Sequence, residues 1–240
     1  MAIKAILFDL DGTLVPMDQD VFVHDYFKRI STKLASHGYE PKQLIDTIWK
    51  GTAAMIKNNS ERCNEEVFWD VAVSVYGDKI LKDKYLFDEF YEQEFDNVKS
   101  VCGYNPKAKE SVNKIKSMGY KVALATNPIF PERATRWRIG WAGLNPADFE
   151  LYTTYENINC CKPNPAYYFE VAKRIGVLPD ECLMVGNDVS DDMSAQNTGM
   201  KVFLLNDCLI NSTNEDISKY PNGSFDELME YINDLKNPLL

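Results

Sequence analysis

The spacing of apolar residues changes character twice along the chain. Residues Ile3–Phe8 form a short, mostly apolar run, which is typical of a strand buried in a parallel sheet. Beyond residue 17 the apolar positions instead recur at helical spacing. They do so in four stretches, which run from Val21 to Leu34, from Pro41 to Ile56, from Glu65 to Tyr76 and from Leu86 to Phe95. Since no strand pattern interrupts them, we predict that residues 17–98 are entirely helical.

Strand and helix patterns alternate after residue 98. Predicted strands cover residues 122–125, 151–154, 183–185 and 202–205, and predicted helices cover residues 106–118, 132–141, 165–175, 191–198 and the region after Ser224. This alternation is typical of a parallel sheet with helices on both faces, so we predict an α/β, Rossmann-like core. The helical region interrupts the alternation after the first strand. We therefore expect a core of residues 1–16 and 99–240 and an inserted all-α cap domain of residues 17–98.

Composition and charge narrow the range of partners. The 240 residues are 45% hydrophobic and 26% charged, which is ordinary for a soluble globular protein. Lys and Arg number 26 against 36 for Asp and Glu, so the net charge is −10. This charge argues against non-specific binding to nucleic acid or to an anionic membrane. No apolar run approaches the roughly 20 residues of a membrane span.

The cysteines and the first residues bear on cellular location. None of the six cysteines forms a CxxC pair or a zinc-binding spacing, so reduced thiols are the expected state. The first apolar run is only as long as a strand and does not resemble a signal peptide. We therefore expect a cytoplasmic protein, as a monomer or a small homo-oligomer.

Two carboxylates follow the first predicted strand, in the sequence Asp9-Leu10-Asp11-Gly12-Thr13. Open α/β sheets bind their ligands at the carboxyl ends of strands. Residues two apart on an extended chain face the same side, so Asp9 and Asp11 can converge on one substrate. Gly12 allows a sharp turn after them. A strand that merely ends in an acidic turn would give the same pattern.

A hydroxyl and a lysine occupy comparable places later in the chain. Thr126 ends the second predicted strand, and its hydroxyl with the backbone of Asn127 can hydrogen-bond a phosphate oxygen, although a Thr-Asn-Pro turn is the alternative. Lys162 lies in the proline-rich segment 160–165, just before a predicted helix. Its ammonium could neutralise a nucleophilic carboxylate and the phosphate that it attacks. A lone lysine in such a loop could equally be solvated.

Three more carboxylates follow the strand at 183–185, because the segment Gly186–Asp192 contains Asp188, Asp191 and Asp192. Mg²⁺ prefers one or two carboxylates together with phosphate oxygens and waters. Acidic residues are also favoured at helix N-termini, so this cluster alone allows either interpretation.

Taken together, the acid pair, the hydroxyl, the lysine and the acid cluster resemble the four ordered motifs of the haloacid dehalogenase superfamily, over the whole chain. The resemblance implies a Mg²⁺-dependent phosphatase that hydrolyses a small phosphorylated metabolite through an aspartyl-phosphate intermediate. It implies that Asp9 is the nucleophile and Asp11 the general acid and base. Thr126 would hold the transferring phosphoryl group, and Lys162 would balance charge.

The resemblance also implies the remaining site residues. Asp9, Asp11, Asp188 and Asp192 would hold the metal, Gly12, Thr13 and Asn127 would contact substrate, and the helices of residues 17–98 would be the family's cap. One departure is visible, since many members have Gly-Asp where this chain has Gly186-Asn187. The alternative is that Asn187 takes the ligand position, supported by Asp191 or Asp192.

Rival functions and the basis of specificity stay open at this stage. A phosphomutase would use the same motifs, whereas a dehalogenase or phosphonatase normally lacks a carboxylate at the position of Asp11. A non-catalytic binding protein would be expected to have lost Asp9, Asp11 or Lys162. We expect specificity to come from the cap and the loop Pro16–Asp20. A further set, Arg133, Arg136 and Arg138, could reach an anionic leaving group or form a solvated helix face.

Overall fold

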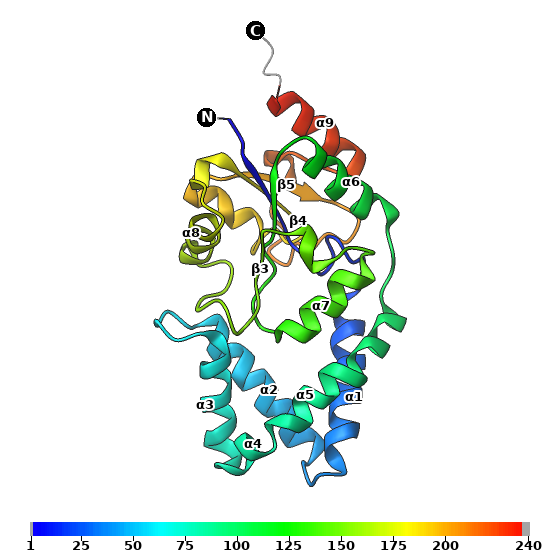
Figure 1. Cartoon of the computed structure of the whole chain (residues 1–240), viewed down its shortest axis with the longest axis vertical. Helices are drawn as coiled ribbons and strands as arrows, with labels where there is room; N and C mark the ends of the chain where they lie inside the picture. The colour runs from blue at the N-terminus through cyan, green and yellow to red at the C-terminus, as the bar shows by residue number, and fades with distance from the viewer. Residues whose placement is uncertain (1, 237–240) are drawn as a thin grey trace.

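A six-stranded parallel sheet lies in the upper part of the computed structural model, which describes residues 2–236 (Figure 1). The strand order is β3-β2-β1-β4-β5-β6, and every neighbouring pair is parallel. The strands are β1 (Ala5–Phe8), β2 (Lys121–Leu124), β3 (Leu151–Tyr152), β4 (Cys182–Gly186), β5 (Lys201–Leu205) and β6 (Asn222–Gly223). The α/β, Rossmann-like fold is thus confirmed, and β6 is an addition within a stretch that shows no strand pattern.

The α-helices lie close to the predicted positions. They are α1 (Gln19–Ala35), α2 (Pro41–Ile56), α3 (Asn64–Tyr76), α4 (Lys79–Lys82), α5 (Lys84–Gln93), α6 (Pro106–Ser117), α7 (Glu132–Trp141), α8 (Pro165–Arg174) and α9 (Phe225–Lys236). The short α4 was not predicted, and the segments η1 (Phe95–Val101) and η4 (Met193–Thr198) are 3₁₀-helices. Within residues 2–236, no helix combines the length and the apolar character needed to cross a membrane.

Burial on both faces explains why β1 is continuously apolar. All four of its side chains have no exposed surface. Because side chains alternate along a strand, Ile6 and Phe8 join one hydrophobic cluster while Ala5 and Leu7 join the other. Helices cover each face of the sheet, as expected for a parallel arrangement.

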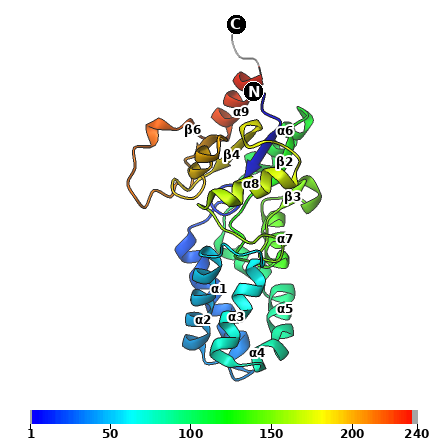
Figure 2. The same ribbon diagram turned by 90° about the vertical axis from the view of Figure 1, so that its left-hand side faces the viewer.

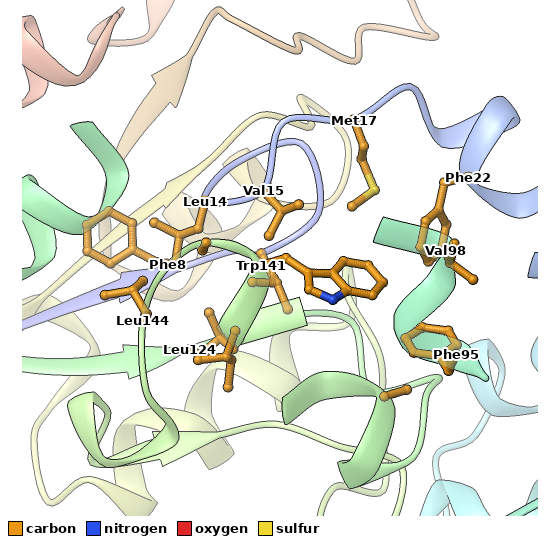
Figure 3. Close-up of a cluster of buried hydrophobic side chains, with 14 of the residues drawn as sticks. Phe8, Leu14, Val15, Met17, Phe22, Phe95, Val98, Leu124, Trp141 and Leu144 are labelled. Carbon is orange, nitrogen blue, oxygen red and sulfur yellow. The ribbon is translucent and has the colours of Figure 1, made fainter. Parts of the chain in front are cut away.

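The helices α1–α5 gather on one side of the sheet in both views, with α7 at the junction (Figures 1 and 2). Residues 17–98 contain no strand, as predicted. One apolar cluster nevertheless includes side chains from this helical segment and from the α/β part (Figure 3). Its Phe95 and Trp141 rings stack at 5.5 Å, and Phe22 contacts Trp141 edge-on at 6.5 Å. The assignment of residues 17–98 as a separate cap domain therefore stays a prediction.

The first turn of α3 makes a second contact between the two parts. The backbone N–H of Asn64 donates to the carbonyl of Ile158 at 3.0 Å, and that of Glu65 donates to Tyr155 at 2.8 Å. The buried Asn64 side chain donates to the Pro128 carbonyl at 3.0 Å. Free N–H groups at a helix start need partners, and here the loop after β3 supplies two of them, while the loop after β2 binds the Asn64 side chain.

Truncating Phe95 tests the aromatic junction, the contact of Phe22 and Phe95 with Trp141. Phe95 has no exposed surface, so Phe95→Ala removes a buried aromatic side chain and should lower the free energy of unfolding by about 3–5 kcal/mol. Urea denaturation measures this loss. Phe169→Ala is the matched control, because Phe169 is 50% exposed. Equal effects of the two substitutions would show that the junction is not a tightly packed core.

Candidate active site

The register of the sheet brings the predicted motifs to one edge. Phe8 of β1 pairs with Leu124 of β2 and with Val185 of β4. The residues that follow these three positions therefore lie side by side, since the strands are parallel. A cavity of about 160 Å³ lies at this edge. It is lined by Asp9, Asp11, Met17, Gln19, Phe22, Val23, Thr126, Asn127, Ile129, Phe130, Lys162, Asn187, Asp188, Asp191 and Asp192.

Lys162 is the cationic centre of this site. Its ammonium lies 2.7 Å from Asp9 Oδ1 and 2.6 Å from Asp192 Oδ1, and all three side chains are buried. The alternative of a solvated lysine is therefore excluded. Burial alone would lower the pKa of Lys162, but the carboxylates of Asp192 and Asp9 raise it well above the usual lysine value. The lysine is thus held as a cation beside the predicted nucleophile.

Asp11 forms a second buried ion pair, with Arg138 of α7. Arg138 has no exposed surface, and its guanidinium also lies 4.5 Å above the Phe130 ring. Burial raises the pKa of Asp11, whereas the Arg138 guanidinium acts to lower it. Only one oxygen of Asp11 is paired, because its Oδ1 is buried without a partner among the described residues. That oxygen is available to a bound molecule.

Gly12 and Thr13 support the site from below the cavity. The Thr13 hydroxyl lies 3.2 Å from Asp9 Oδ2 and 2.9 Å from Asn187 Oδ1. A Cβ on Gly12 would come within 2.4 Å of the Asn187 amide, and the φ of Gly12 is +83°. Glycine is thus required here by both conformation and space. Neither residue lines the cavity, and their predicted contact with substrate is not tested.

Thr126 and Asn127 join the second motif to the others. The Thr126 carbonyl accepts hydrogen bonds from Tyr167 at 2.8 Å and Thr153 at 2.6 Å, which fixes the backbone. Asn127 donates to Asp191 Oδ2 at 2.8 Å and accepts from the backbone N–H of Lys162 at 3.0 Å. Asn127 therefore links the loops after β2 and β4 to the lysine segment.

The carboxylates of the segment Gly186–Asp192 make different contacts. Asp188 Oδ1 accepts the backbone N–H groups of Ser190 and Asp191 at 2.7 and 2.9 Å. Asp192 Oδ2 accepts the backbone N–H of Asp188 at 2.9 Å. Burial raises the pKa of Asp192 to about 7, which the Lys162 ammonium opposes. Both oxygens of Asp192 are therefore already bound, whereas Asp188 keeps one oxygen without a partner among residues 2–236.

Asn187 is fixed by three contacts of its own. Its side chain accepts from Thr13 and donates to the Cys208 carbonyl at 2.7 Å, and its backbone carbonyl accepts from Ile210 at 2.9 Å. These bonds hold the Asn187 amide in place between Gly12 and the loop 206–212. The amide therefore serves the packing of the loops, and the neighbouring Asp188 and Asp191 each keep one carboxylate oxygen without a partner among the described residues.

The charges of the site suit a divalent cation. The lining residues include five carboxylates and one cationic side chain, Lys162. Among residues 2–236, no three His, Cys, Asp or Glu side chains already form a metal-binding cluster. Mg²⁺ does not require one, since one or two protein carboxylates with phosphate oxygens and waters suffice. The unpaired Oδ1 of Asp11 and the free oxygen of Asp188 fit that coordination.

Arg138 and the apolar lining are the parts that sequence reasoning missed. Arg138 neither reaches outward nor lies on a solvated face, because it is buried against Asp11. Its position three and four residues after Thr135 and Ala134, which are also buried, was the available signal. Arg133 and Arg136 do lie on the exposed face, where they pair with Glu92 and Glu132.

The predicted specificity loop does reach the cavity. Met17 and Gln19, both within Pro16–Asp20, line it together with Phe22 and Val23 of α1. Ile129 and Phe130, which follow the Thr-Asn-Pro segment, also line it, and the Phe130 ring contacts Phe22 edge-on at 6.1 Å. No sequence pattern marked Ile129 or Phe130.

Comparison with known proteins agrees with this arrangement. The family model described as haloacid dehalogenase-like hydrolase matches residues 3–199. The "Putative phosphatase YhcW" of Bacillus subtilis is 28% identical over 211 residues, covering 85% of this chain and 83% of that protein. Two solved structures share the fold. A predicted phosphoglycolate phosphatase from Haemophilus somnus has a TM-score of 0.58 at 21% identity, covering 95% of this chain and 97% of its own.

The second structure, a putative β-phosphoglucomutase from Thermotoga maritima, has a TM-score of 0.54 at 19% identity and covers 97% of this chain and 99% of its own. The family match spans well over half of the 240 residues and contains every site residue described above. This chain therefore belongs to the haloacid dehalogenase-like hydrolase family, as its four motifs predict.

Proposed function

We propose that the protein is a Mg²⁺-dependent phosphatase that hydrolyses a small phosphorylated metabolite through an aspartyl-phosphate intermediate. The observation that carries the proposal is the buried Lys162, bound to both Asp9 and Asp192 at the carboxyl ends of the central strands. A fixed cation beside a carboxylate allows an anionic phosphate to approach that carboxylate. Membership of a hydrolase family and phosphatase-like relatives agree with it.

In the first step, a carboxylate oxygen of Asp9 attacks phosphorus while the bond from phosphorus to the leaving oxygen breaks. Asp11 donates a proton to that leaving oxygen, and burial, which favours its protonated form, supports this role. Thr126 and Asn127 line the cavity at the strand ends, where they can bind the transferring phosphoryl group.

In the second step, Asp11 takes a proton from a water molecule, which attacks phosphorus and breaks the bond to Asp9. Inorganic phosphate leaves and the Asp9 carboxylate is restored. Lys162 stays beside Asp9 throughout and limits the build-up of negative charge. The five lining carboxylates make a second cation necessary, because an anion would otherwise be repelled.

Bound Mg²⁺ would polarise the phosphate oxygens and neutralise their charge. Of the four predicted ligands, Asp11 and Asp188 each keep an oxygen without a partner among the described residues, whereas both oxygens of Asp9 already contact Lys162 or Thr13. Asp192 already binds Lys162 and the Asp188 backbone, so we infer that it orients these two groups. Its predicted role as a direct ligand would compete with both contacts.

A phosphomutase remains the second candidate, since the fold neighbour from Thermotoga maritima carries that name. The same Asp9 and Asp11 would then return the phosphoryl group to a bound sugar. Incubation with a hexose phosphate distinguishes the two reactions, because only a phosphatase releases inorganic phosphate stoichiometrically.

The proposed roles of Asp9 and Asp11 predict different effects of their substitution on turnover. Asp9→Asn should reduce turnover to background because no phosphoenzyme can form. Asp11→Asn should cost about 10²–10⁴-fold with an alkyl phosphate and less with p-nitrophenyl phosphate, whose leaving group departs without protonation. Steady-state kinetics on both esters measures this, with mass spectrometry of quenched protein to detect a phosphorylated Asp9. Normal turnover in Asp9→Asn would contradict the assignment.

Metal dependence gives a second test. Hydrolysis should stop in excess chelator and return with Mg²⁺. Asp188→Asn should raise the Mg²⁺ concentration for half-maximal activity roughly tenfold or more, a loss seen even for outer-shell substitutions. Asp226→Asn is the control, because that carboxylate is 72% exposed and lies on α9. Full activity in chelator would rule out the metal.

The pair of Asp11 and Arg138 predicts a coupled loss of stability. Arg138→Met leaves the Asp11 carboxylate without its partner, so it should lower the free energy of unfolding by about 3 kcal/mol. Combining it with Asp11→Asn removes the unpaired charge and should recover part of that loss, as measured by urea denaturation. If the two losses simply add, the two side chains are not an energetically coupled pair.

A further inference from the structure

A second cavity adjoins the active-site cavity and lies mainly within the helical segment. It has a volume of about 80 Å³, well above the roughly 10–15 Å³ that one water molecule requires. Helices α1, α2, α3 and α5 contribute to it, with Ile129–Pro131 and Tyr155 from the α/β part. Val23, Ile129 and Phe130 line both cavities, so a molecule bound at Asp9 can extend past these three side chains.

The lining of this second cavity is almost wholly apolar. It consists of Val23, Tyr26, Phe27, Ile30, Ile48, Trp49, Thr52, Phe68, Trp69, Phe87, Asp88, Tyr91, Ile129, Phe130, Pro131 and Tyr155. The hydroxyls of Tyr26 and Tyr91 bind each other at 2.7 Å, which uses one of their two donors. The buried Trp69 Nε1 has no hydrogen-bond partner among the described residues, and with the Thr52 and Tyr155 hydroxyls of the lining it could bind a neutral oxygen of a ligand.

Charge separates two classes of substrate. Among the described residues that line the two cavities, Lys162 is the only cation, and it is already shared by Asp9 and Asp192. The one charged residue of the second cavity is Asp88, which is an exposed anion. A carboxylate or second phosphate on the leaving group would therefore meet no unpaired cation there, because the nearby Arg138 guanidinium and Lys84 ammonium already pair with Asp11 and Glu65. A neutral apolar group would replace water against aromatic surface.

We propose that the substrate is a phosphate monoester with a neutral, apolar leaving group of a few carbon atoms, aromatic or branched, which occupies this second cavity. The inference rests on the proposed phosphatase activity and specifies its substrate class. It distinguishes this chain from phosphatases whose substrates have a leaving group with a second negative charge.

A matched pair of esters tests the charge argument. Isobutyl phosphate and phosphoglycolate have leaving groups of similar shape and differ mainly in the carboxylate. We expect kcat/KM for isobutyl phosphate to exceed that for phosphoglycolate at least tenfold. Along the series from methyl to butyl phosphate, kcat/KM should rise by up to roughly fourfold for each methylene that becomes buried. A preference for phosphoglycolate or pyrophosphate would overturn the proposal.

Filling the cavity tests the location. Thr52→Phe should lower the ratio of kcat/KM for benzyl phosphate to that for methyl phosphate at least tenfold, because the new ring takes the space of the leaving group. Thr32→Phe is the control, since Thr32 is exposed on α1 and lines neither cavity. An unchanged ratio in folded Thr52→Phe protein would contradict the location. If that variant fails to fold, the ester series on the unmodified protein still decides the substrate class.

Asp9→Asn separates the two proposals. If it abolishes hydrolysis while phosphoglycolate is the better substrate, the leaving-group inference is wrong and the phosphatase mechanism stands. If it leaves the turnover of every ester unchanged, the phosphatase mechanism itself is wrong.

Discussion

The balance of buried charge at Lys162 is the constraint on which the site depends. The ammonium bridges two carboxylates that come from β1 and from the loop after β4. Without it, two buried carboxylates would face each other with no cation between them. The loop that carries Lys162 must therefore return to the same sheet edge, and Asn127 holds its backbone there. Lys162 thus joins three motifs, which are its own, that of Asp9 and that of Asp192.

Small residues make room for this arrangement. A Cβ at Gly186 would lie 2.1 Å from the Asp192 carboxylate, and one at Gly12 would meet Asn187. Gly186 ends β4, and Gly12 lies in the turn that follows the adjacent strand β1. Backbone and carboxylate can approach each other only where a side chain is missing. The buried charges around Lys162 can therefore pack closely only because glycine occupies these two positions.

Much of this could be predicted from the sequence because the motifs lie at strand ends, and strands are visible as apolar runs. Asp9, Thr126 and Asp188 were found in this way. The partner of Lys162 was harder to predict from the sequence, because Asp9 lies 153 positions away and only the fold or a family resemblance joins them. Arg138 and the second cavity were not predicted. Both depend on how helices pack against one another, and helical spacing indicates which face is buried without indicating what covers it.

The start of α3 has a consequence for the entry of ligands. Its first N–H groups bind carbonyls of the loop 155–158, which leads directly to Lys162. Water could satisfy those same groups if the helix and the loop separated, but separation would also expose the small apolar cluster of Met55, Tyr155 and Cys161. The aromatic contacts around Phe95 belong to a larger apolar cluster, and water cannot replace contacts between buried rings. A motion that admits substrate would therefore expose less buried apolar surface by opening at α3 than by opening at the aromatic side.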